Sequence, residues 1–125
     1  MAKPTVAIIG ASRDRTKFGN KAVRAYLKQG YDVYPVNPNE TTIEGLTCYR
    51  SVLDVPVEPD RISVYLPPAV SLKVLDEIVA KNAKEVWLNP GAESDEVIRR
   101  AAELGLRSVV ACSIMGVGED PDQIE

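Results

Sequence analysis

The 125-residue chain is 45% hydrophobic and 26% charged, and its formal net charge is −3. A length and composition of this kind predict a single domain over residues 1–125 and exclude a disordered or repetitive chain. The small net charge argues against a nucleic-acid-binding surface, and no apolar run approaches the roughly 20 residues of a membrane span. We therefore expect a cytoplasmic protein in which Cys48 and Cys112 are reduced, partly buried thiols.

A strand, a glycine-led loop and a helix are predicted first. Residues 5–9 form a short, continuously apolar run that ends at Gly10, as in a strand buried on both faces of a parallel sheet. A helix of about ten residues is expected after the loop, because apolar residues recur there at helical spacing and Gly30 stands at a suitable end. Its predicted buried stripe is Ala22, Val23, Tyr26 and Leu27.

Residues 32–36 predict a second strand, followed by a turn-rich connection over residues 37–59. Pro35 has no N–H to donate, so one edge of this strand is expected to be irregular or unpaired. Within the connection, residues 51–54 are expected to form a short helical turn. The residues expected to pack on the core from this connection are Ile43, Leu46 and Tyr49.

The second half of the chain repeats the alternation of strand and helix. Residues 60–66 predict a strand that a pair of prolines stops, and a helix is expected from about Ala69. Residues 85–89 predict the next strand, which ends at a Pro-Gly pair. The buried stripe of the intervening helix is expected to be Leu72, Leu75, Ile78 and Val79.

The last predicted elements are a helix, a strand and a tail. Ser94 is expected to cap the helix at its start and Gly105 to close it. Residues 107–111 predict the final strand, and residues 119–125 are expected to be a loosely ordered, acidic tail.

This alternation predicts an α/β fold, a Rossmann-like doubly wound three-layer sandwich with a mainly parallel five-stranded sheet. In such folds the ligand lies at the carboxyl ends of the strands, beside the point where strand order reverses. The segments that directly follow the strands are therefore the candidate site. They are residues 10–13, 36–38, 66–68, 89–91 and 112–113.

The loop after the first strand has the character of an anion site. Gly10 permits the tight turn, and the amides of Ala11 to Arg13 with the following helix N-terminus can bind phosphate. The dinucleotide fingerprint Gly-x-Gly-x-x-Gly fails, however, because Ser12 and Arg15 occupy the second and third glycine positions. The second strand also ends without the acidic residue that holds the ribose of NAD, so ordinary NAD binding is disfavoured.

Basic residues concentrate around this loop. Residues 1–30 contain seven lysines and arginines and a single acidic residue, Asp14. Three of the cations, Arg13, Arg15 and Lys17, lie in the loop itself, so it is suited to more phosphate charge than one pyrophosphate presents. Coenzyme A carries this extra charge on its ribose, and an acidic residue that would repel it is missing from the end of the second strand.

The ordered segments resemble a known family, the small stand-alone CoA-binding proteins whose domain is similar to the nucleotide-binding domain of the succinyl-CoA ligase alpha subunit. The resemblance spans nearly the whole chain. It is carried by residues 6–12, 17–21, 34–38, 65–68, 87–91 and 111–113.

The resemblance implies that CoA, or an acyl-CoA, lies across the strand ends. Its phosphates would meet the loop and Lys17, its adenosine the segments 36–38 and 66–68, and its pantetheine arm the segment 89–91. Helix capping is an equal alternative for Asn20, and turn formation an equal alternative for Asn37. The expected ligand contacts are Gly10, Ala11, Ser12, Arg13, Lys17, Asn20, Val36, Asn37, Pro38, Leu66, Pro67, Pro68, Asn89, Pro90 and Gly91.

The sequence argues for binding rather than catalysis. It contains no histidine, and no metal site or catalytic constellation is visible in it. The resembled ligase subunit depends on a phosphorylated histidine in a further domain, so the resemblance implies only a non-catalytic binding module. We expect Cys112 to be a structural thiol, because no basic residue near it in sequence marks a reactive thiolate. The alternative is thiol exchange between Cys112 and the pantetheine sulfur.

Two other functions remain open at this stage. The chain could be an NAD(P)-binding enzyme or redox sensor, in which the basic loop would bind a 2′-phosphate. It could also be an interaction subunit whose nucleotide site has decayed. We expect a small-molecule nucleotide ligand and neither a nucleic acid nor a membrane as partner; a protein partner or a homo-oligomer leaves no sequence signal.

Overall fold

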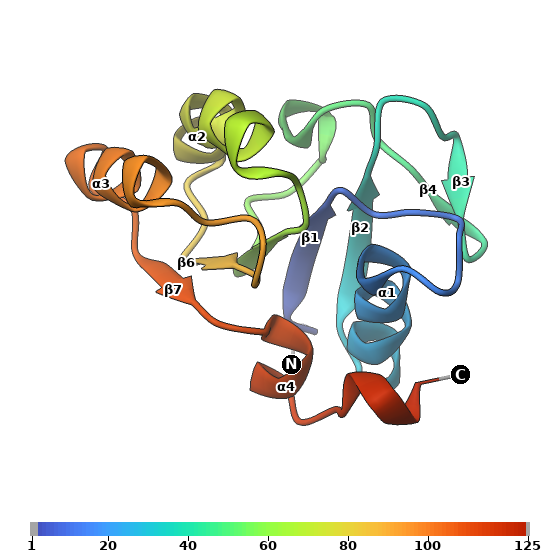
Figure 1. Ribbon diagram of the computed structural model, residues 1–125. Coiled ribbons are helices and arrows are strands. Elements are labelled where there is room, and N and C mark those ends of the chain that lie inside the picture. The colour runs from blue at the N-terminus through green and yellow to red at the C-terminus, as the bar shows by residue number, and fades with distance from the viewer. Residues whose placement is uncertain (1–2, 125) are drawn as a thin grey trace.

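Five strands form one all-parallel sheet in the computed structural model, which describes residues 3–124 (Figure 1). Each strand pairs in parallel with its neighbours, in the order β2-β1-β5-β6-β7. The predicted Rossmann-like α/β fold with a parallel five-stranded sheet is therefore confirmed. The strands are β1 (Thr5–Ile9), β2 (Asp32–Val36), β5 (Arg61–Val64), β6 (Glu85–Leu88) and β7 (Ser108–Val110).

Helices cover both faces of the sheet. The α-helices are α1 (Phe18–Lys28), α2 (Pro68–Lys81), α3 (Asp95–Glu103) and α4 (Ser113–Gly116). Figure 1 shows α2 and α3 together on one side of the sheet and α1 and α4 on the other. Alternate residues of β1 accordingly enter two separate hydrophobic clusters: Ala7 and Ile9 pack with α2 and α3, whereas Val6 and Ile8 pack with α1 and α4.

The chain reverses direction across the sheet at β1. From β1 it crosses to β2 on one side, and then returns past β1 to place β5 on the other side. The carboxyl ends of β1 and β5 therefore border the position at which doubly wound proteins bind their ligands. None of the helices in residues 3–124 is long and apolar enough to cross a membrane.

The connection after β2 contains a hairpin that the sequence did not predict. Strands β3 (Thr42–Ile43) and β4 (Leu46–Thr47) pair antiparallel, and the two residues between them, Glu44 and Gly45, both have positive φ. Glu-Gly is a weak signal for such a turn compared with Asn-Gly. The expected packing of this connection is otherwise confirmed, because Ile43 is buried and the short helix η1 (Val52–Asp54) follows Ser51.

The outer edge of β2 is irregular, as the proline within it predicts. β2 is an edge strand of the sheet, and Tyr49 contacts its outer side. The N–H of Tyr49 donates to the carbonyl of Pro35 at 2.9 Å, and the N–H of Asn37 donates to the carbonyl of Tyr49 at 2.9 Å. A proline is tolerated here because no regular ladder needs its missing donor.

Two predicted core positions are wrong. Leu27 and Val79 are 39% and 37% exposed, because each lies on the helix face beside the buried one, and the preceding residues, Tyr26 and Ile78, are the ones that enter the core. In α2 a polar residue, Ser71, is buried instead, and its hydroxyl donates to the carbonyl of Leu66 at 3.2 Å. This hydrogen bond satisfies the hydroxyl inside the core.

The segment expected to be a loose tail packs on the body of the domain over its described residues, 119–124. At the end of α1, Lys28 forms an ion pair with Glu119, and the side-chain amide of Gln29 donates a hydrogen bond to the same carboxylate. A short helix, η2 (Pro121–Gln123), follows, and Ile124 packs against the cluster beneath α1. A charged contact and an apolar contact thus connect residues 119–124 to the region of α1, and residue 125 lies outside the described residues.

Candidate functional site

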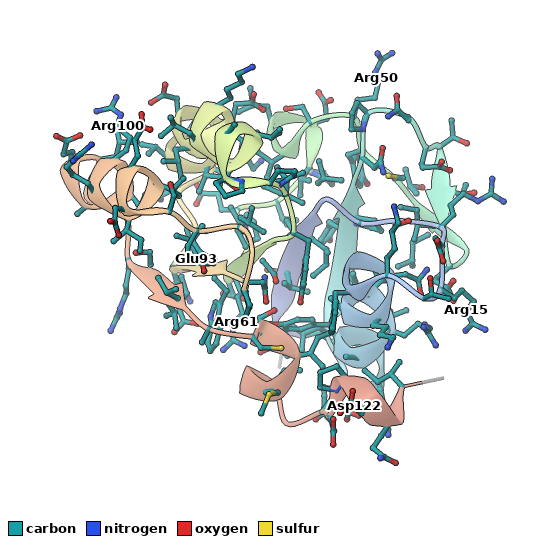
Figure 2. The ribbon with its side chains drawn as sticks, in the orientation of Figure 1. Arg15, Arg50, Arg61, Glu93, Arg100 and Asp122 are labelled. Atoms are coloured by element: carbon teal, nitrogen blue, oxygen red, sulfur yellow. The ribbon has the colours of Figure 1, made fainter. Side chains whose placement is uncertain are left out.

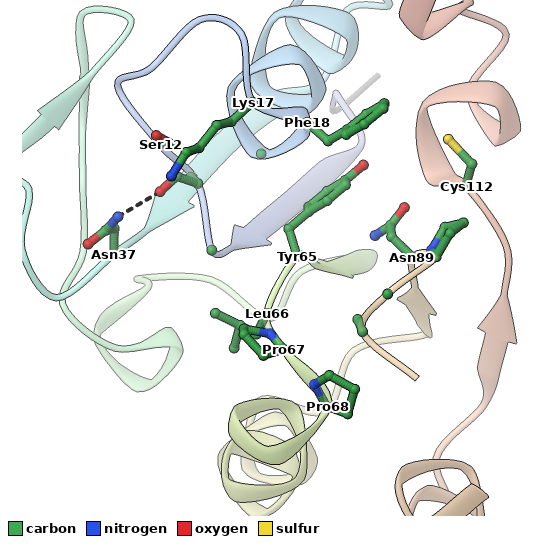
Figure 3. A pocket seen from close by; sticks show the side chains of 16 residues that line it. Ser12, Lys17, Phe18, Asn37, Tyr65, Leu66, Pro67, Pro68, Asn89 and Cys112 are labelled. Carbon is green, nitrogen blue, oxygen red and sulfur yellow. Dashed lines mark hydrogen bonds between the residues drawn. The ribbon is translucent and has the colours of Figure 1, made fainter. Parts of the chain in front are cut away.

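A cleft of about 750 Å³ lies at the carboxyl ends of the strands (Figure 3). It is lined by the loop after β1, the end of β2, the segment between β5 and α2, and the segments after β6 and β7. All the predicted site residues line it except Arg13, Asn20, Val36 and Pro38. The lining residues are Gly10, Ala11, Ser12, Lys17, Phe18, Gly19, Asn37, Tyr65, Leu66, Pro67, Pro68, Asn89, Pro90, Gly91, Ala92 and Cys112.

Two glycines bring the loop, the sheet and α1 into close contact. Gly10 has φ +87°, and a Cβ on it would collide with the carbonyl oxygen of Tyr65 at the end of β5. A Cβ on Gly19, in the first turn of α1, would collide with the carbonyl oxygen of Gly10. Gly19 therefore has the role of the third fingerprint glycine, which permits close packing of helix on strand, although it does not stand at the usual spacing.

Two buried or half-buried asparagines fix the orientation of the loop peptides. The side-chain amide of Asn37 donates to the carbonyl of Ala11 at 2.8 Å, the dashed line in Figure 3. The side-chain amide of Asn20 donates to the carbonyl of Ser12 at 2.8 Å. Because a trans peptide is planar, fixing these carbonyls also fixes the N–H groups of Ser12 and Arg13, which point the opposite way.

The loop also has backbone donors available for an anion. Within residues 3–124, the N–H groups of Ala11, Ser12 and Arg13 donate to no protein acceptor. Asn20 does not cap α1, since the residue at the cap position is Lys17 and its side chain makes no capping bond. Asn20 is fully buried and orients the loop without lining the cleft.

Only one of the three loop cations lines the cleft. Arg13 is 3.6 Å from the carboxylate of Glu40, and Arg15 is 3.3 Å from that of Glu44. Lys17 is exposed, lines the cleft and has no ion pair within the described part of the chain. The expectation that Arg13 contacts the ligand is therefore not supported by its position, because a carboxylate holds it outside the cleft.

An adjoining pocket of about 390 Å³ is lined by two of the predicted residues that do not line the cleft. Val36 and Pro38, at the end of β2, line this pocket. It shares three lining residues with the cleft, Gly10, Asn37 and Leu66, so the two spaces are adjacent. The predicted segments 36–38 and 66–68 thus meet here, as expected for neighbouring ends of parallel strands.

Asn89 lies at the base of the cleft, but protein groups engage its side chain. Its Nδ2 donates to Ser63 Oγ at 2.9 Å and to the carbonyl of Val64 at 2.9 Å. Its Oδ1 accepts from the N–H of Ser113 at 2.8 Å. Asn89 therefore joins β5, β6 and the start of α4, and it is 2% exposed.

Four cleft residues escaped prediction: Phe18, Gly19, Tyr65 and Ala92. Cys112 also lines the cleft and belongs to the predicted segment 112–113, although it was not among the expected ligand contacts. Figure 3 shows Tyr65 between the side with Ser12 and Lys17 and the side with Asn89 and Cys112. Its hydroxyl is 3.3 Å from Ser113 Oγ, and burial raises its pKa well above the ordinary value, so it stays protonated. Tyr65 could have been found from sequence, because it directly precedes the predicted segment 66–68.

Two of these residues border the cleft with exposed or half-exposed side chains. Phe18 is 54% exposed at the first position of α1, an unusual place for a large apolar ring. Cys112 is a half-buried free thiol between β7 and α4. No group of three or more histidine, cysteine or acidic side chains within residues 3–124 is placed to hold a metal ion. The cleft thus offers an anion site at one end and apolar walls along its length.

The chain matches the family model described as CoA binding domain over residues 4–118. It is 36% identical over 94 residues to the ADP-forming acetate–CoA ligase II of Archaeoglobus fulgidus, which covers 74% of this chain and 14% of the ligase. It is 35% identical over 115 residues to the alpha subunit of the ADP-forming acetate–CoA ligase II of Pyrococcus furiosus, covering 83% of this chain and 25% of that subunit. The chain therefore spans a quarter or less of the length of these curated relatives.

A solved structure of similar extent has the same fold. It is a conserved hypothetical protein of Pyrococcus furiosus, 36% identical to this chain with a TM-score of 0.80. The superposition covers 92% of this chain and 99% of that one. The parallel sheet with helices on both faces is thus common to both proteins.

Proposed function

Because the chain belongs to the CoA binding domain family, we propose that it binds coenzyme A or an acyl-CoA in the cleft as a non-catalytic module. The observation that carries the proposal is the composition of the cleft. One end is lined by Ser12 and by Lys17, which has no ion pair within residues 3–124, and the walls include apolar side chains such as Phe18 and Leu66. CoA likewise has a charged pyrophosphate and a long, weakly polar pantetheine arm, which match these two regions of the cleft.

The proposed path of CoA runs through the cleft and the adjacent pocket. The pyrophosphate lies against the amides of residues 11–13 and near Lys17, where a helix N-terminus adds favourable potential. The adenosine occupies the adjoining pocket at the end of β2, between Val36 and Leu66. The pantetheine arm extends past Tyr65 toward residues 89–91, which leaves its thiol on the side of the cleft bordered by Cys112.

The proposal is limited to binding, because the chain matches only part of its ligase relatives and contains no histidine. The ligand-facing acid expected of an NAD site is also missing at the tip of β2, where Val36 is followed by Asn37 and Pro38. Both observations favour a CoA module over an NAD enzyme. A protein partner for the module is proposed on the ground that one relative is an alpha subunit.

Calorimetric titration of the purified chain with CoA and with NAD tests the proposal. We expect CoA to bind and NAD to bind more weakly or not at all. Lys17→Glu should weaken CoA by about tenfold or more, since it replaces a charge-assisted contact with repulsion. Lys73→Glu is the matched control, because Lys73 is exposed on α2 and lines neither the cleft nor the adjoining pocket.

The result is decisive in either direction. No measurable heat with CoA, or tighter binding of NAD, would reject the proposal. Equal loss of affinity in Lys17→Glu and Lys73→Glu would show that net charge, and not the cleft, governs binding. Native mass spectrometry of the purified protein supplements the titration, since a retained CoA species would also identify the acyl group.

A further inference from the structure

The pocket at the end of β2 is bordered by an arginine that has no carboxylate partner. Arg50 is exposed and lines this pocket of about 390 Å³. Figure 2 shows it at the outer surface, above the end of β2. Within residues 3–124 it forms no ion pair, in contrast to Arg13 and Arg15, which Glu40 and Glu44 hold. Arg50 is therefore the cation at this pocket that is available to a ligand.

The rest of the pocket is suited to a nucleoside. Its walls are largely aliphatic, which suits the faces of a base ring. One carboxylate, Glu77, also lines the pocket, and it accepts a hydrogen bond from the hydroxyl of Ser51 at 2.6 Å. A phosphate on the sugar is therefore best placed at the rim, beside Arg50 and away from Glu77. The aliphatic lining residues are Ile9, Val36, Val52, Leu66, Val70 and Val74.

We propose that Arg50 recognises the phosphate monoester on the ribose of the bound nucleotide, which in CoA is the 3′-phosphate. The inference rests on the proposed function. In doubly wound folds the ribose lies near the tip of the second strand, where an acid selects a free diol and an arginine accepts a phosphate. Here the tip carries no acid, Glu40 is paired with Arg13, and the planar guanidinium of Arg50 can bind a phosphate through two N–H groups.

The same chemistry would be presented by the 2′-phosphate of NADP, so the experiment includes both sources. Calorimetry compares CoA with 3′-dephospho-CoA, and NADPH with NADH, on the wild type and on Arg50→Gln. We expect the wild type to prefer CoA over 3′-dephospho-CoA by about tenfold or more. Arg50→Gln should lower the affinity for CoA by the same factor and leave 3′-dephospho-CoA unchanged.

A matched variant separates local recognition from general charge. Arg107→Gln removes the same charge at the opposite end of the sheet, because Arg107 is exposed and directly precedes β7. It should leave the preference for CoA intact. Thermal unfolding of both variants should match the wild type, since neither arginine side chain has a hydrogen bond or an ion pair within the described residues.

The outcomes distinguish this inference from the proposed function. If CoA and 3′-dephospho-CoA bind the wild type equally, Arg50 has no such role although the CoA site stands. If Arg50→Gln weakens both equally, it acts on another part of the ligand and the inference is wrong. If neither binds, the proposed function fails first. A preference for NADPH over NADH and CoA, lost in Arg50→Gln, would overturn the assignment to the 3′-phosphate.

Discussion

Single residues determine how closely the loop, the sheet and the first helix approach one another. Gly10 lies against the carbonyl of Tyr65, and Gly19 lies against the carbonyl of Gly10. Both contacts are between backbone atoms, which cannot rotate away as a side chain can. The amide clamps from Asn20 and Asn37 then orient the peptides between these two glycines. The proposed anion site is therefore shaped by glycines and by the side chains of Asn20 and Asn37, which hold its backbone N–H groups in place.

Gly19→Ala tests this dependence. The added methyl group would press on the carbonyl of Gly10, so we expect the free energy of unfolding to fall by about 1–3 kcal/mol. Because the displaced backbone belongs to the loop, the affinity for CoA should fall as well. Urea unfolding measures the first effect and calorimetry the second.

Gly116→Ala is the control for the glycine experiment. Its methyl group would approach the ring of Trp87 to 2.5 Å, so it also strains the structure, but on a side chain remote from the loop. Stability should fall while the affinity for CoA stays unchanged. Unchanged stability and affinity in Gly19→Ala would mean that α1 need not contact the loop.

Sequence alone could predict which backbone segments meet at the cleft, because the ends of parallel strands share one edge of the sheet. It could not predict the role of Gly19, since the fingerprint depends on a fixed spacing that this longer loop does not keep. Nor could it predict that Arg15 pairs with Glu44, which is 29 residues away and reaches the loop only through the unpredicted hairpin. The number of cations available to a ligand was overestimated for this reason.

At the scale of elements, the start of β1 is fastened to the start of β5 by reciprocal hydrogen bonds. Asp60 Oδ2 accepts from the N–H of Thr5 at 2.9 Å and from its hydroxyl at 3.2 Å. The N–H of Asp60 donates back to Thr5 Oγ1 at 2.9 Å, and Lys84 lies 3.2 Å from the carboxylate. These bonds align the two central strands, whose other ends border the cleft.

This fastening predicts a pH dependence of stability. The backbone hydrogen bond from Thr5 holds the pKa of Asp60 below its ordinary value. The folded state therefore binds the proton more weakly than the unfolded chain, whose aspartate pKa is about 3.9. The contribution of ionised Asp60 to the free energy of unfolding is complete above this pKa of the unfolded chain. It is lost as the pH falls through the lower pKa of the folded state.

Urea unfolding of wild type and Asp60→Asn between pH 7 and pH 3 measures this contribution. The wild type should be more stable by a constant amount at the higher pH values, and the difference should shrink below about pH 4. Asp54→Asn serves for comparison, since Asp54 is exposed at the end of η1. A difference between wild type and Asp60→Asn that is the same at pH 3 and pH 7 would contradict the assignment.

For the whole molecule, the order of the five sheet strands and of α1, α2 and α3 followed from the sequence, whereas the hairpin of β3 and β4 and the short helix α4 did not. Alternating apolar strands and amphipathic helices predict a doubly wound sheet, since few other arrangements bury both. The contacts of residues 119–124 could not be predicted from the sequence, because they depend on tertiary structure. Glu119 meets Lys28, and Ile124 meets a cluster whose members range from Val6 to Ile114.

Removal of residues 119–125 tests whether this packing stabilises the domain. We expect a loss of about 1 kcal/mol in the free energy of unfolding, chiefly from exposure of apolar surface around Ile124. The affinity for CoA should not change, because the segment packs beside the end of α1 and does not line the cleft. Equal stability of the shortened chain would restore the expectation of a loose tail.

The reversal of strand order at β1 also has a kinetic consequence. Residues 5–36 contain β1 and β2, residues 61–110 contain the other three strands, and the two groups meet through β1 and β5. A molecule in the cleft touches both groups, and it can do so only after they have joined. Contacts that form this late slow unfolding and leave the folding rate nearly unchanged. The unfolding rate should therefore fall as the fraction of molecules with an occupied cleft rises.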